Sequence, residues 1–293
     1  MKKLLVLSGK GGTGKTTAAG AMIRFARAGA SADCDVDAPN LHLVAGVGGQ
    51  PERKRFIGSE KARINPAVCV GCGRCAELCR FQAIGEDQGA FQVREHACEG
   101  CGVCAWACPV QAVTMEEDKA GEQYLYREAR VFSTARLKMG RGNTGKLVTA
   151  VKLDMMKGAP EADFAVIDGS PGIGCPVMAS ISGVDLVLIV AEPSLSGRSD
   201  LERLLDTVEG MRARAAVCVN KWDVSPENTA GIMDLCRMRN IPFLGKIPYD
   251  RSASDAVNKG ITLAEIDCPA RDALYHIYEQ VSQLLALPSA NLE

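Results

Sequence analysis

The feature that most constrains this chain is a cysteine pattern that occurs twice between residues 69 and 108. Each run has the spacing Cys-x2-Cys-x2-Cys-x3-Cys, and the second run, which Pro109 follows, repeats the first 29 residues later. The runs consist of Cys69, Cys72, Cys75 and Cys79, and of Cys98, Cys101, Cys104 and Cys108. This spacing is typical of cysteines that hold [4Fe–4S] clusters. It predicts a small module that folds around two clusters.

The order of the cysteines also predicts which of them share a cluster. In proteins with two such clusters, the fourth cysteine of each run ligates the cluster of the other run. The expected ligands are therefore Cys69, Cys72, Cys75 and Cys108 for one cluster, and Cys98, Cys101, Cys104 and Cys79 for the second. The copies differ after the fourth cysteine, where Arg80 stands in the first copy and Pro109 in the second.

Two other uses of cysteine fit this pattern less well. A disulfide framework is typical of short secreted chains, whereas this chain has 293 residues and its first apolar run is too short for an export signal. Structural zinc sites usually separate their cysteine pairs by longer gaps. The remaining cysteines are scattered, at Cys34, Cys175, Cys218, Cys236 and Cys268.

A second motif lies near the start of the chain, where residues 9–16 read Gly-Lys-Gly-Gly-Thr-Gly-Lys-Thr. It satisfies G-x4-G-K-S/T, a loop whose backbone N–H groups cradle phosphates. Lys15 is expected to reach the β and γ phosphates, and the Thr16 hydroxyl to ligate Mg²⁺. The same residues satisfy the G-x-G-x-x-G of dinucleotide folds, but Lys15 followed by Thr16 favours the phosphate loop. The residues expected to hold the phosphates are Gly9, Lys10, Gly11, Gly12, Thr13, Gly14, Lys15, Thr16 and Thr17.

The rest of the chain alternates between apolar runs and segments of helical composition. Strands buried on both faces of a parallel sheet are predicted at residues 4–7, 164–168, 186–190 and 215–219. Helices are predicted at residues 17–27, 200–212, 228–238 and 271–287. This alternation predicts a doubly wound, mostly parallel α/β fold. The cysteine segment interrupts it, so we expect a P-loop domain from residues 1–57 plus 119–293, and an inserted small α+β domain of the bacterial ferredoxin type at residues 58–118.

The extra lysine of the loop, Lys10, resembles the deviant Walker A motif of the MinD/ParA and nitrogenase-iron-protein class. Three further segments are similar to that class. Residues 33–43 resemble its switch I, residues 168–172 its Walker B and switch II, and residues 244–250 its late strand and adenine-side loop. Over its whole length, the chain resembles MinD-superfamily ATPases that carry an inserted ferredoxin domain with two [4Fe–4S] clusters.

This resemblance implies roles for individual residues. Two protomers would enclose two nucleotides, with Lys10 reaching the phosphates across the interface and Asp35 orienting the attacking water. Thr16 and Asp168 would hold Mg²⁺. Nucleotide contacts are also expected from Gly172, Asn220 and Pro248. Residues 220–223 read Asn-Lys-Trp-Asp, which matches the guanine-selecting N-K-x-D of GTPases, but the rest of the resemblance favours ATP over GTP.

Composition restricts the function further. The formal net charge is −1, which gives no reason to expect a nucleic acid partner. No run of about 18 apolar residues is present to span a membrane, so we expect a cytoplasmic protein without a membrane anchor. The chain is predicted to be a slow, Mg²⁺-dependent and partner-stimulated ATPase. Its nucleotide-switched dimer would gate electron transfer, or metal-cluster assembly, on a partner protein. The alternatives are a MinD/ParA-like positioning ATPase with the clusters as a redox sensor, an iron–sulfur scaffold or carrier, and an electron carrier with a vestigial phosphate loop.

Overall fold

The structure is a computed structural model that describes residues 1–87 and 89–286. The chain divides into two compact units, each of which is described by itself below. The larger unit comprises Met1–Arg53, Gln123–Arg136 and the chain from Gly145 onwards. The smaller unit comprises Lys54–Glu122 and Leu137–Thr144. The second segment of the smaller unit lies outside the insertion at residues 58–118 that the sequence predicts.

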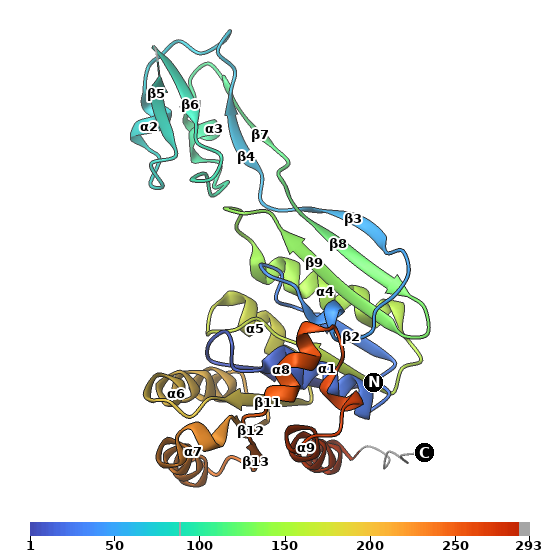
Figure 1. The fold of residues 1–293 in the computed structure, drawn as a ribbon. Helices are drawn as coiled ribbons and strands as arrows, with labels where there is room; N and C mark the ends of the chain where they lie inside the picture. The colour runs from blue at the N-terminus through green and yellow to red at the C-terminus, as the bar shows by residue number, and fades with distance from the viewer. Residues whose placement is uncertain (88, 287–293) are drawn as a thin grey trace. The chain divides into compact units, whose positions relative to one another are not determined.

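The described residues include a nine-stranded sheet with the strand order β13-β12-β11-β1-β10-β2-β9-β8-β3. Pairing is parallel throughout from β13 to β9. Its strands are β1 (Lys2–Leu7), β2 (Ala30–Asp33), β3 (Glu52–Ile57), β8 (Lys119–Arg127), β9 (Val131–Leu137), β10 (Phe164–Asp168), β11 (Leu186–Ala191), β12 (Ala215–Asn220) and β13 (Phe243–Ile247). The mostly parallel α/β fold predicted from the sequence is confirmed (Figure 1).

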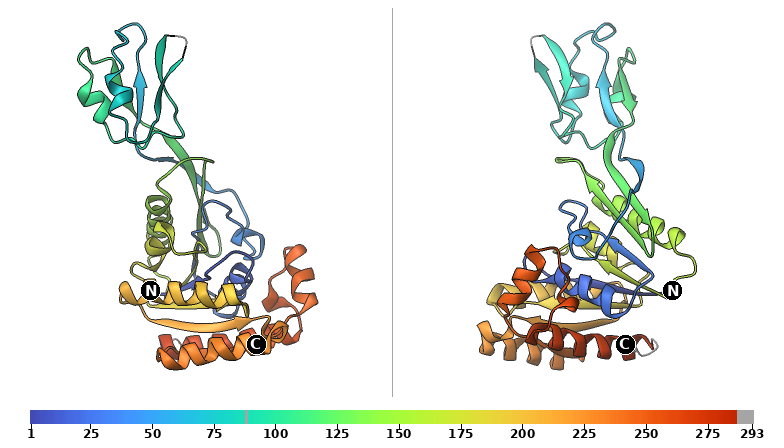
Figure 2. Two further views of the ribbon diagram at one scale, coloured as in Figure 1. Left: turned by 90° about the vertical axis from the view of Figure 1, so that its left-hand side faces the viewer. Right: turned by 45° about the vertical axis from the view of Figure 1, so that its right-hand side comes forward.

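Helices cover both faces of the parallel strands. Those of the larger unit are α1 (Lys15–Phe25), α4 (Thr144–Gly158), α5 (Cys175–Ile181), α6 (Leu195–Gly210), α7 (Pro226–Met238), α8 (Arg251–Asn258) and α9 (Pro269–Leu285), with short 3-10 turns η1 (Leu41–Leu43), η2 (Trp222–Val224) and η3 (Leu263–Glu265). Helices α1 and α9 pack on one face, and α6 and α7 lie on the other (Figures 1 and 2). The strands are therefore buried on both sides, which explains their continuous apolar sequences.

The predicted strands are all present, whereas all four predicted helices begin earlier in the chain than expected. The helix predicted at residues 200–212 begins at Leu195 and ends at Gly210. It starts earlier because the Ser194 side chain caps it by accepting a hydrogen bond from the Gly197 N–H. The first helix begins at Lys15, directly after the glycine loop. The C-terminal helix is α9, and residue 287 of its predicted range lies outside the described residues.

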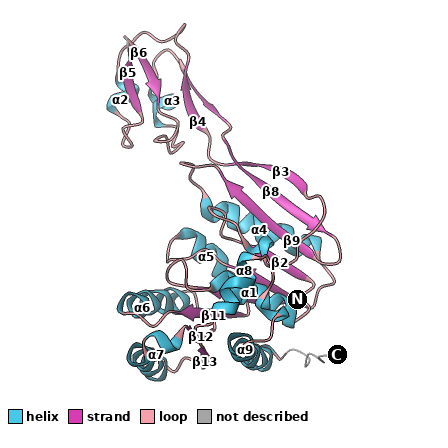
Figure 3. Cartoon of the chain, in the orientation of Figure 1, coloured by secondary structure: helices cyan, strands magenta, loops and turns pink. Residues whose placement is uncertain are grey.

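The smaller unit contains two antiparallel pairs of short strands, β4 with β7 and β5 with β6 (Figure 3). Its elements are β4 (Lys61–Ile64), α2 (Arg74–Glu77), β5 (Ile84–Asp87), β6 (Ala90–Val93), α3 (Val103–Ala107) and β7 (Val113–Glu116). The 29-residue spacing of the cysteines extends to these elements, since β4, α2 and β5 correspond to β6, α3 and β7. Each pair joins a strand of one copy to a strand of the other.

The repeat also governs the backbone of the cysteine loops. Gly73 and Gly102 precede α2 and α3 with φ of 73° and 77°, a conformation that favours glycine. Gln82 and Gln111 share another left-handed position, with φ of 50° and 53°. The sequence therefore encodes one loop geometry twice, although the side chains between the cysteines differ.

The segment Leu137–Thr144 is held to the cysteine-bearing part of the smaller unit by charged and polar contacts. The Arg141 guanidinium donates to Glu95 at 2.9 Å and lies 3.4 Å from the carboxylate of Asp118. Asn143 and Ser59 exchange hydrogen bonds through their side chains. Because α4 starts at the end of this segment, the smaller unit leads directly into a helix of the larger one.

Candidate nucleotide and iron–sulfur sites

The candidate nucleotide site lies at the carboxyl ends of the parallel strands. The glycine loop follows β1, Asp33 and Asp168 end the neighbouring strands β2 and β10, and Asn220 ends β12. Pro248 comes directly after β13. In open parallel sheets, this edge is where ligands bind. The fold thus brings together loops that lie more than 200 residues apart in the chain.

Asp168 accepts contacts from the side chains of Lys15 and Thr16, the first two residues of α1. Lys15 Nζ lies 2.6 Å from Asp168 Oδ1, and Thr16 Oγ1 donates to Asp168 Oδ2 at 2.7 Å. Asp168 is fully buried, and this burial raises the pKa of its carboxyl, which the Lys15 ammonium opposes. The oxygens of Thr16 and Asp168 suit Mg²⁺, a hard cation that prefers oxygen ligands. Lys15 neutralises the buried carboxylate here.

Asp33 organises the loop that follows β2. Its Oδ1 accepts a hydrogen bond from the Asp35 N–H at 3.0 Å, and its Oδ2 accepts from the N–H groups of Asn40 and Leu41, both at 2.9 Å. Burial, together with the charge of Asp168, raises the pKa of Asp33 to about 7. Sequence reasoning assigned no role to Asp33, although its place at the end of a buried strand was the available signal.

Two hydrogen bonds connect the segment after β10 with its neighbours, one with the loop after β2 and one with the residue after β1. The Ser170 hydroxyl donates to the Cys34 carbonyl at 2.6 Å. The Gly172 N–H donates to the carbonyl of Ser8, the residue before the glycine loop, at 3.1 Å. The segment that resembles switch II (residues 168–172) is therefore bonded both to the segment that resembles switch I (residues 33–43) and to the residue before the glycine loop.

A cavity of about 410 Å³ borders the glycine loop on the switch side. Lys15, Thr16 and Asp35 line it, together with Asn40 and Pro171. Burial raises the pKa of Asp35 above its ordinary value. The predicted phosphate-binding and water-orienting residues thus face one space.

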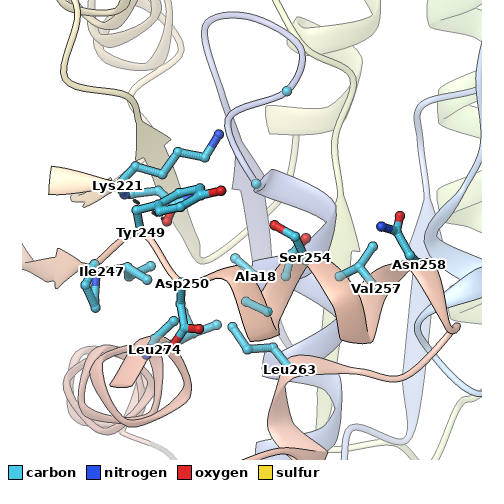
Figure 4. Close-up of a pocket in the computed structure, with 17 residues that line it drawn as sticks. Ala18, Lys221, Ile247, Tyr249, Asp250, Ser254, Val257, Asn258, Leu263 and Leu274 are labelled. Atoms are coloured by element: carbon cyan, nitrogen blue, oxygen red, sulfur yellow. Dashed lines mark hydrogen bonds between the residues drawn. The ribbon is translucent and has the colours of Figure 1, made fainter. Parts of the chain in front are cut away.

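A second cavity, of about 280 Å³, borders the other side of the loop. Gly12, Gly14 and Thr17 line it, as do Asn220 and Pro248. Figure 4 shows that Lys221 and Tyr249 lie on one side of this cavity, and that Ser254, Val257 and Asn258 come from α8. The two cavities share the glycine loop, which suits a ligand with phosphates at one end and a base at the other.

Asn220 is fixed against the glycine loop. Its Nδ2 donates to the Thr13 carbonyl at 2.7 Å, and a Cβ at Gly14 would lie 2.4 Å from the same Nδ2. With a φ of 92°, Gly14 is therefore required both for its conformation and for this close approach. The carboxylate of Asp223 accepts a hydrogen bond from the Tyr249 N–H at 2.7 Å. The last residue of the N-K-x-D motif thus binds backbone of the loop after β13.

The side chain of Lys10 contacts residues outside the predicted site. Its Nζ lies 2.7 Å from Glu192 Oε2 and 3.2 Å from the hydroxyls of both Ser194 and Ser196. Glu192 follows β11, and Ser194 caps α6. The ammonium group therefore points to the start of α6 of its own chain.

The eight clustered cysteines line two cavities of the smaller unit. Cys69, Cys72, Cys75 and Cys108 line the first cavity. Cys79, Cys98, Cys101 and Cys104 line the second cavity. Each cavity thus takes three cysteines from one copy and the fourth from the other, as the spacing predicts. No group of three or more His, Cys, Asp or Glu side chains in residues 1–87 and 89–286 is placed to hold a single metal ion. A [4Fe–4S] cube does not need such a point, because each cysteine ligates a different iron.

Backbone amides point at the sulfurs that close each set. The Ala83 N–H donates to Cys79 Sγ at 3.3 Å, and the Ala112 N–H donates to Cys108 Sγ at 3.2 Å. Burial raises the pKa of Cys108, but backbone N–H groups, foremost that of Ala112, outweigh it and lower the pKa below its usual value. Amides of this kind stabilise thiolates and the sulfurs of bound clusters. The donor set therefore fits two [4Fe–4S] clusters.

Comparison with known proteins identifies the family. The model of the CobQ/CobB/MinD/ParA nucleotide binding domain matches residues 4–263. The chain belongs to this family. A protein of Methanocaldococcus jannaschii without an assigned function is 30% identical over 97% of both chains. An iron-sulfur cluster carrier protein of Pyrococcus abyssi is 25% identical, over 95% of this chain and 85% of its own.

Solved structures agree on the fold. The septum site-determining protein MinD of Pyrococcus horikoshii, complexed with Mg-ADP, has a TM-score of 0.58 at 18% identity, over 97% of this chain and 96% of its own. The match to members of the CobQ/CobB/MinD/ParA family confirms the P-loop fold predicted from residues 9–16. None of the helices in the described part of the chain is long and apolar enough to cross a bilayer.

Three residues outside the predicted set contribute to the site. They are Asp33 in switch I, Glu192 as the partner of Lys10, and Lys152 of α4. The buried Lys152 Nζ donates to three carbonyl oxygens at the end of α5, those of Ala179, Ser180 and Ser182, at 2.6 to 2.9 Å. It thereby fixes the helix that follows switch II. No local motif marks Glu192 or Lys152, because their partners are distant in sequence.

Proposed function

We propose that this chain is a Mg²⁺-dependent, slow, partner-stimulated ATPase that uses nucleotide-driven dimerisation to gate electron transfer, or metal-cluster assembly, on a partner protein. The observation that carries the proposal is the arrangement of eight cysteines in two complete sets of four on a chain that also has a P-loop site. The proposal includes a P-loop domain at residues 1–57 plus 119–293 and an inserted ferredoxin domain at residues 58–118.

The residues at the P-loop suit ATP hydrolysis. Lys15 would bind the phosphates once it leaves Asp168, and Thr16 with Asp168 would hold Mg²⁺. Asp35 borders the same cavity and would orient the attacking water. Asn220 and Pro248 would face the base, and Gly172 would position switch II against the glycine loop. Lys10 would leave Glu192 and contact the phosphates bound to a second copy of the chain.

The cysteine sets favour resident clusters. A [4Fe–4S] cluster supplies one-electron transfer when bound. Since Cys79 and Cys108 each close the set of the other copy, removal of either cluster would disturb both copies of the repeat. That interlocked arrangement supports electron transfer more than release of a cluster.

Continuous segments offer a route from the nucleotide to the clusters. Switch I leads through η1 to β3, and β3 begins in the larger unit and ends in the smaller one. A second continuous segment, Leu137–Thr144, leads into α4, where a Cβ at Gly145 would lie 3.3 Å from the carbonyl of Cys175, three residues after switch II. A change in either switch would therefore pull on a segment that continues into the smaller unit.

A cluster carrier is the second candidate, because relatives such as the Pyrococcus abyssi protein are named iron-sulfur cluster carrier proteins. Carriers of this superfamily are expected to use a Cys-x2-Cys late in the ATPase domain. After Cys108, this sequence has no Cys-x2-Cys. Cys218, Cys236 and Cys268 are buried. These observations favour the gated redox function.

Anaerobic potentiometry of the holoprotein with and without MgATP tests the proposal. If ATP binds tenfold more tightly to one oxidation state, linkage shifts the midpoint potential by about 59 mV. Lys15→Ala should abolish both the shift and hydrolysis while retaining iron. Iron is also counted on an apo-acceptor protein after incubation. An unchanged potential would reject gating, and intact clusters on the acceptor would favour the carrier.

A further inference from the structure

The two copies of the cysteine repeat differ on the outer face of their helices. Arg74 and Glu77 in α2 correspond, 29 residues later, to Val103 and Trp106 in α3. Trp106 is 85% exposed and Val103 is 41% exposed. The first copy forms the same helix with charged residues at these two positions. The apolar residues of α3 are therefore not needed to form the helix.

The exposed apolar side chains of α3 adjoin the second cysteine cavity. Val103 and Phe81 both line the cavity formed by Cys79, Cys98, Cys101 and Cys104, and Phe81 is 45% exposed. Trp106 lies three residues after Val103, hence on the same side of the helix. We call Phe81, Val103 and Trp106 the apolar face.

The first cavity has a different border. Val70 and Val110 line it and are exposed, but Arg74 lines it as well, and Glu77 takes the place of the tryptophan. An exposed tryptophan next to smaller apolar side chains is characteristic of binding hot spots in protein interfaces. The second cavity therefore has the surface better suited to a protein partner.

We propose that the apolar face is the docking surface for a redox protein that presents an apolar patch ringed by Lys and Arg, and that electrons pass through the second cluster. The proposal rests on the proposed function. One electron moves between the second cluster and the partner's redox centre, so that one is oxidised as the other is reduced, and no bond or proton is transferred.

Charge determines the kind of partner. Four thiolates around a [4Fe–4S]²⁺ core give a net charge of about −2. The carboxylate of Glu99 lines the same cavity and offsets the charge of the Lys61 ammonium, which donates to the Cys98 carbonyl, so this border stays negative. A basic rim on the partner would complement this negative border. A second copy of the chain would instead bring an equal negative border against the first, so self-association through this face is disfavoured.

Cytochrome c, a lysine-rich haem protein with a partly exposed haem edge, serves as the probe. Its affinity for the oxidised holoprotein is measured by isothermal titration, and its reduction by the pre-reduced holoprotein is followed optically. Trp106→Gln is compared with Glu77→Gln, the equivalent position of the first copy. Phe81→Gln provides a second variant of the apolar face. Iron content and cluster spectra establish that all three variants keep both clusters.

We expect Trp106→Gln to raise the dissociation constant about tenfold and to slow electron transfer to cytochrome c by a similar factor. Phe81→Gln should act in the same direction, and Glu77→Gln should change neither value more than about twofold. Absence of binding, or equal effects of Trp106→Gln and Glu77→Gln, would overturn the proposal. The proposal would also be overturned if sedimentation showed a dimer without nucleotide and Trp106→Gln dissociated that dimer, because the apolar face would then bind a second copy of the chain.

The outcome is separable from that of the proposed function. If Trp106→Gln weakens docking while MgATP leaves the potential unchanged, the docking surface stands and gating fails. If MgATP shifts the potential while Trp106→Gln behaves as Glu77→Gln, gating stands and the docking surface is wrong.

Discussion

Lys10 and Glu192 form an ion pair with 2.7 Å between Nζ and Oε2. The hydroxyls of Ser194 and Ser196 complete the environment of the ammonium group. Lys10 is the lysine that distinguishes the deviant loop from ordinary P-loops, and we propose that it acts on the nucleotide of a second copy. It must then leave Glu192, so the ion pair within one chain competes with dimerisation.

Glu192→Gln should therefore favour the nucleotide-bound dimer. A partly exposed ion pair contributes about 1 kcal/mol, and a dimer breaks two of them. The dimerisation constant with a non-hydrolysable ATP analogue and Mg²⁺ should rise about 30-fold, measured by sedimentation velocity. Glu202→Gln, which removes the ion pair with Arg198 farther along α6, is the matched control. Equal constants for the two variants would show that Glu192 does not restrain Lys10.

Asp33 should control the order of switch I. Its carboxylate accepts three backbone hydrogen bonds, from residues 35, 40 and 41, and Asp33→Ala removes all of them. We expect the amides of Asn40 and Leu41 to lose hydrogen-exchange protection, and ATP to bind at least about tenfold more weakly. Asp37→Ala, at an exposed position of the same segment, should leave both unchanged. If these amides stay protected in Asp33→Ala, then the Asp33 carboxylate does not order this loop.

The crossed cysteine sets make a spectroscopic prediction. Cys79 lines the cavity of Cys98, Cys101 and Cys104, so Cys79→Ser should damage the same cluster as Cys98→Ser. Electron paramagnetic resonance of the reduced proteins should give matching spectra for these two variants and a different spectrum for Cys75→Ser. Cys175→Ser should retain the full iron content of about eight per chain. A Cys79→Ser spectrum that matches Cys75→Ser would reverse the assignment.

The sequence predicted the parts of the fold that depend on continuous apolar runs. β10, β11, the last four residues of β1 and the central four residues of β12 are buried, so the apolar signal there is continuous. β8 was missed because only Ala120, Gly121 and Leu125 of this strand are buried and because it includes charged side chains. The start of α6 was missed because Gly197, Ser194 and Ser196 occupy its first turn and cap. The low helix propensity of these residues is outweighed by the Ser194 side chain, which caps the helix.

For the site, local motifs located the residues but not the contacts between them. The glycine loop and cysteine spacing act through neighbours in sequence, so their residues could be named in advance. The pair of Lys10 with Glu192 joins residues 182 positions apart. The hydrogen bond from Ser170 to Cys34 spans 136 positions. Such contacts can be predicted only when the strand order is known, and the patterns of a single sequence do not contain that order.

Lys152 should give the larger unit a pH-dependent stability. Burial lowers the pKa of this side chain from 10.5 to about 8 in the folded protein. Between these values the unfolded chain binds more protons than the folded chain, so stability rises as the pH increases from 8 to about 10.5. The gain approaches about 3 kcal/mol. Urea unfolding at several pH values, followed by circular dichroism, measures it.

Lys152→Met should remove this rise, because methionine has no proton to release. Lys157→Met, at an exposed position of the same helix, should preserve the slope of the wild type and thereby controls for loss of one positive charge. Comparing slopes separates titration from the constant loss of the hydrogen bonds to α5. If Lys152→Met and the wild type gain equal stability above pH 8, then Lys152 does not titrate in this range. The hydrogen bonds from Lys152 of α4 to the end of α5 would then be independent of pH in this range.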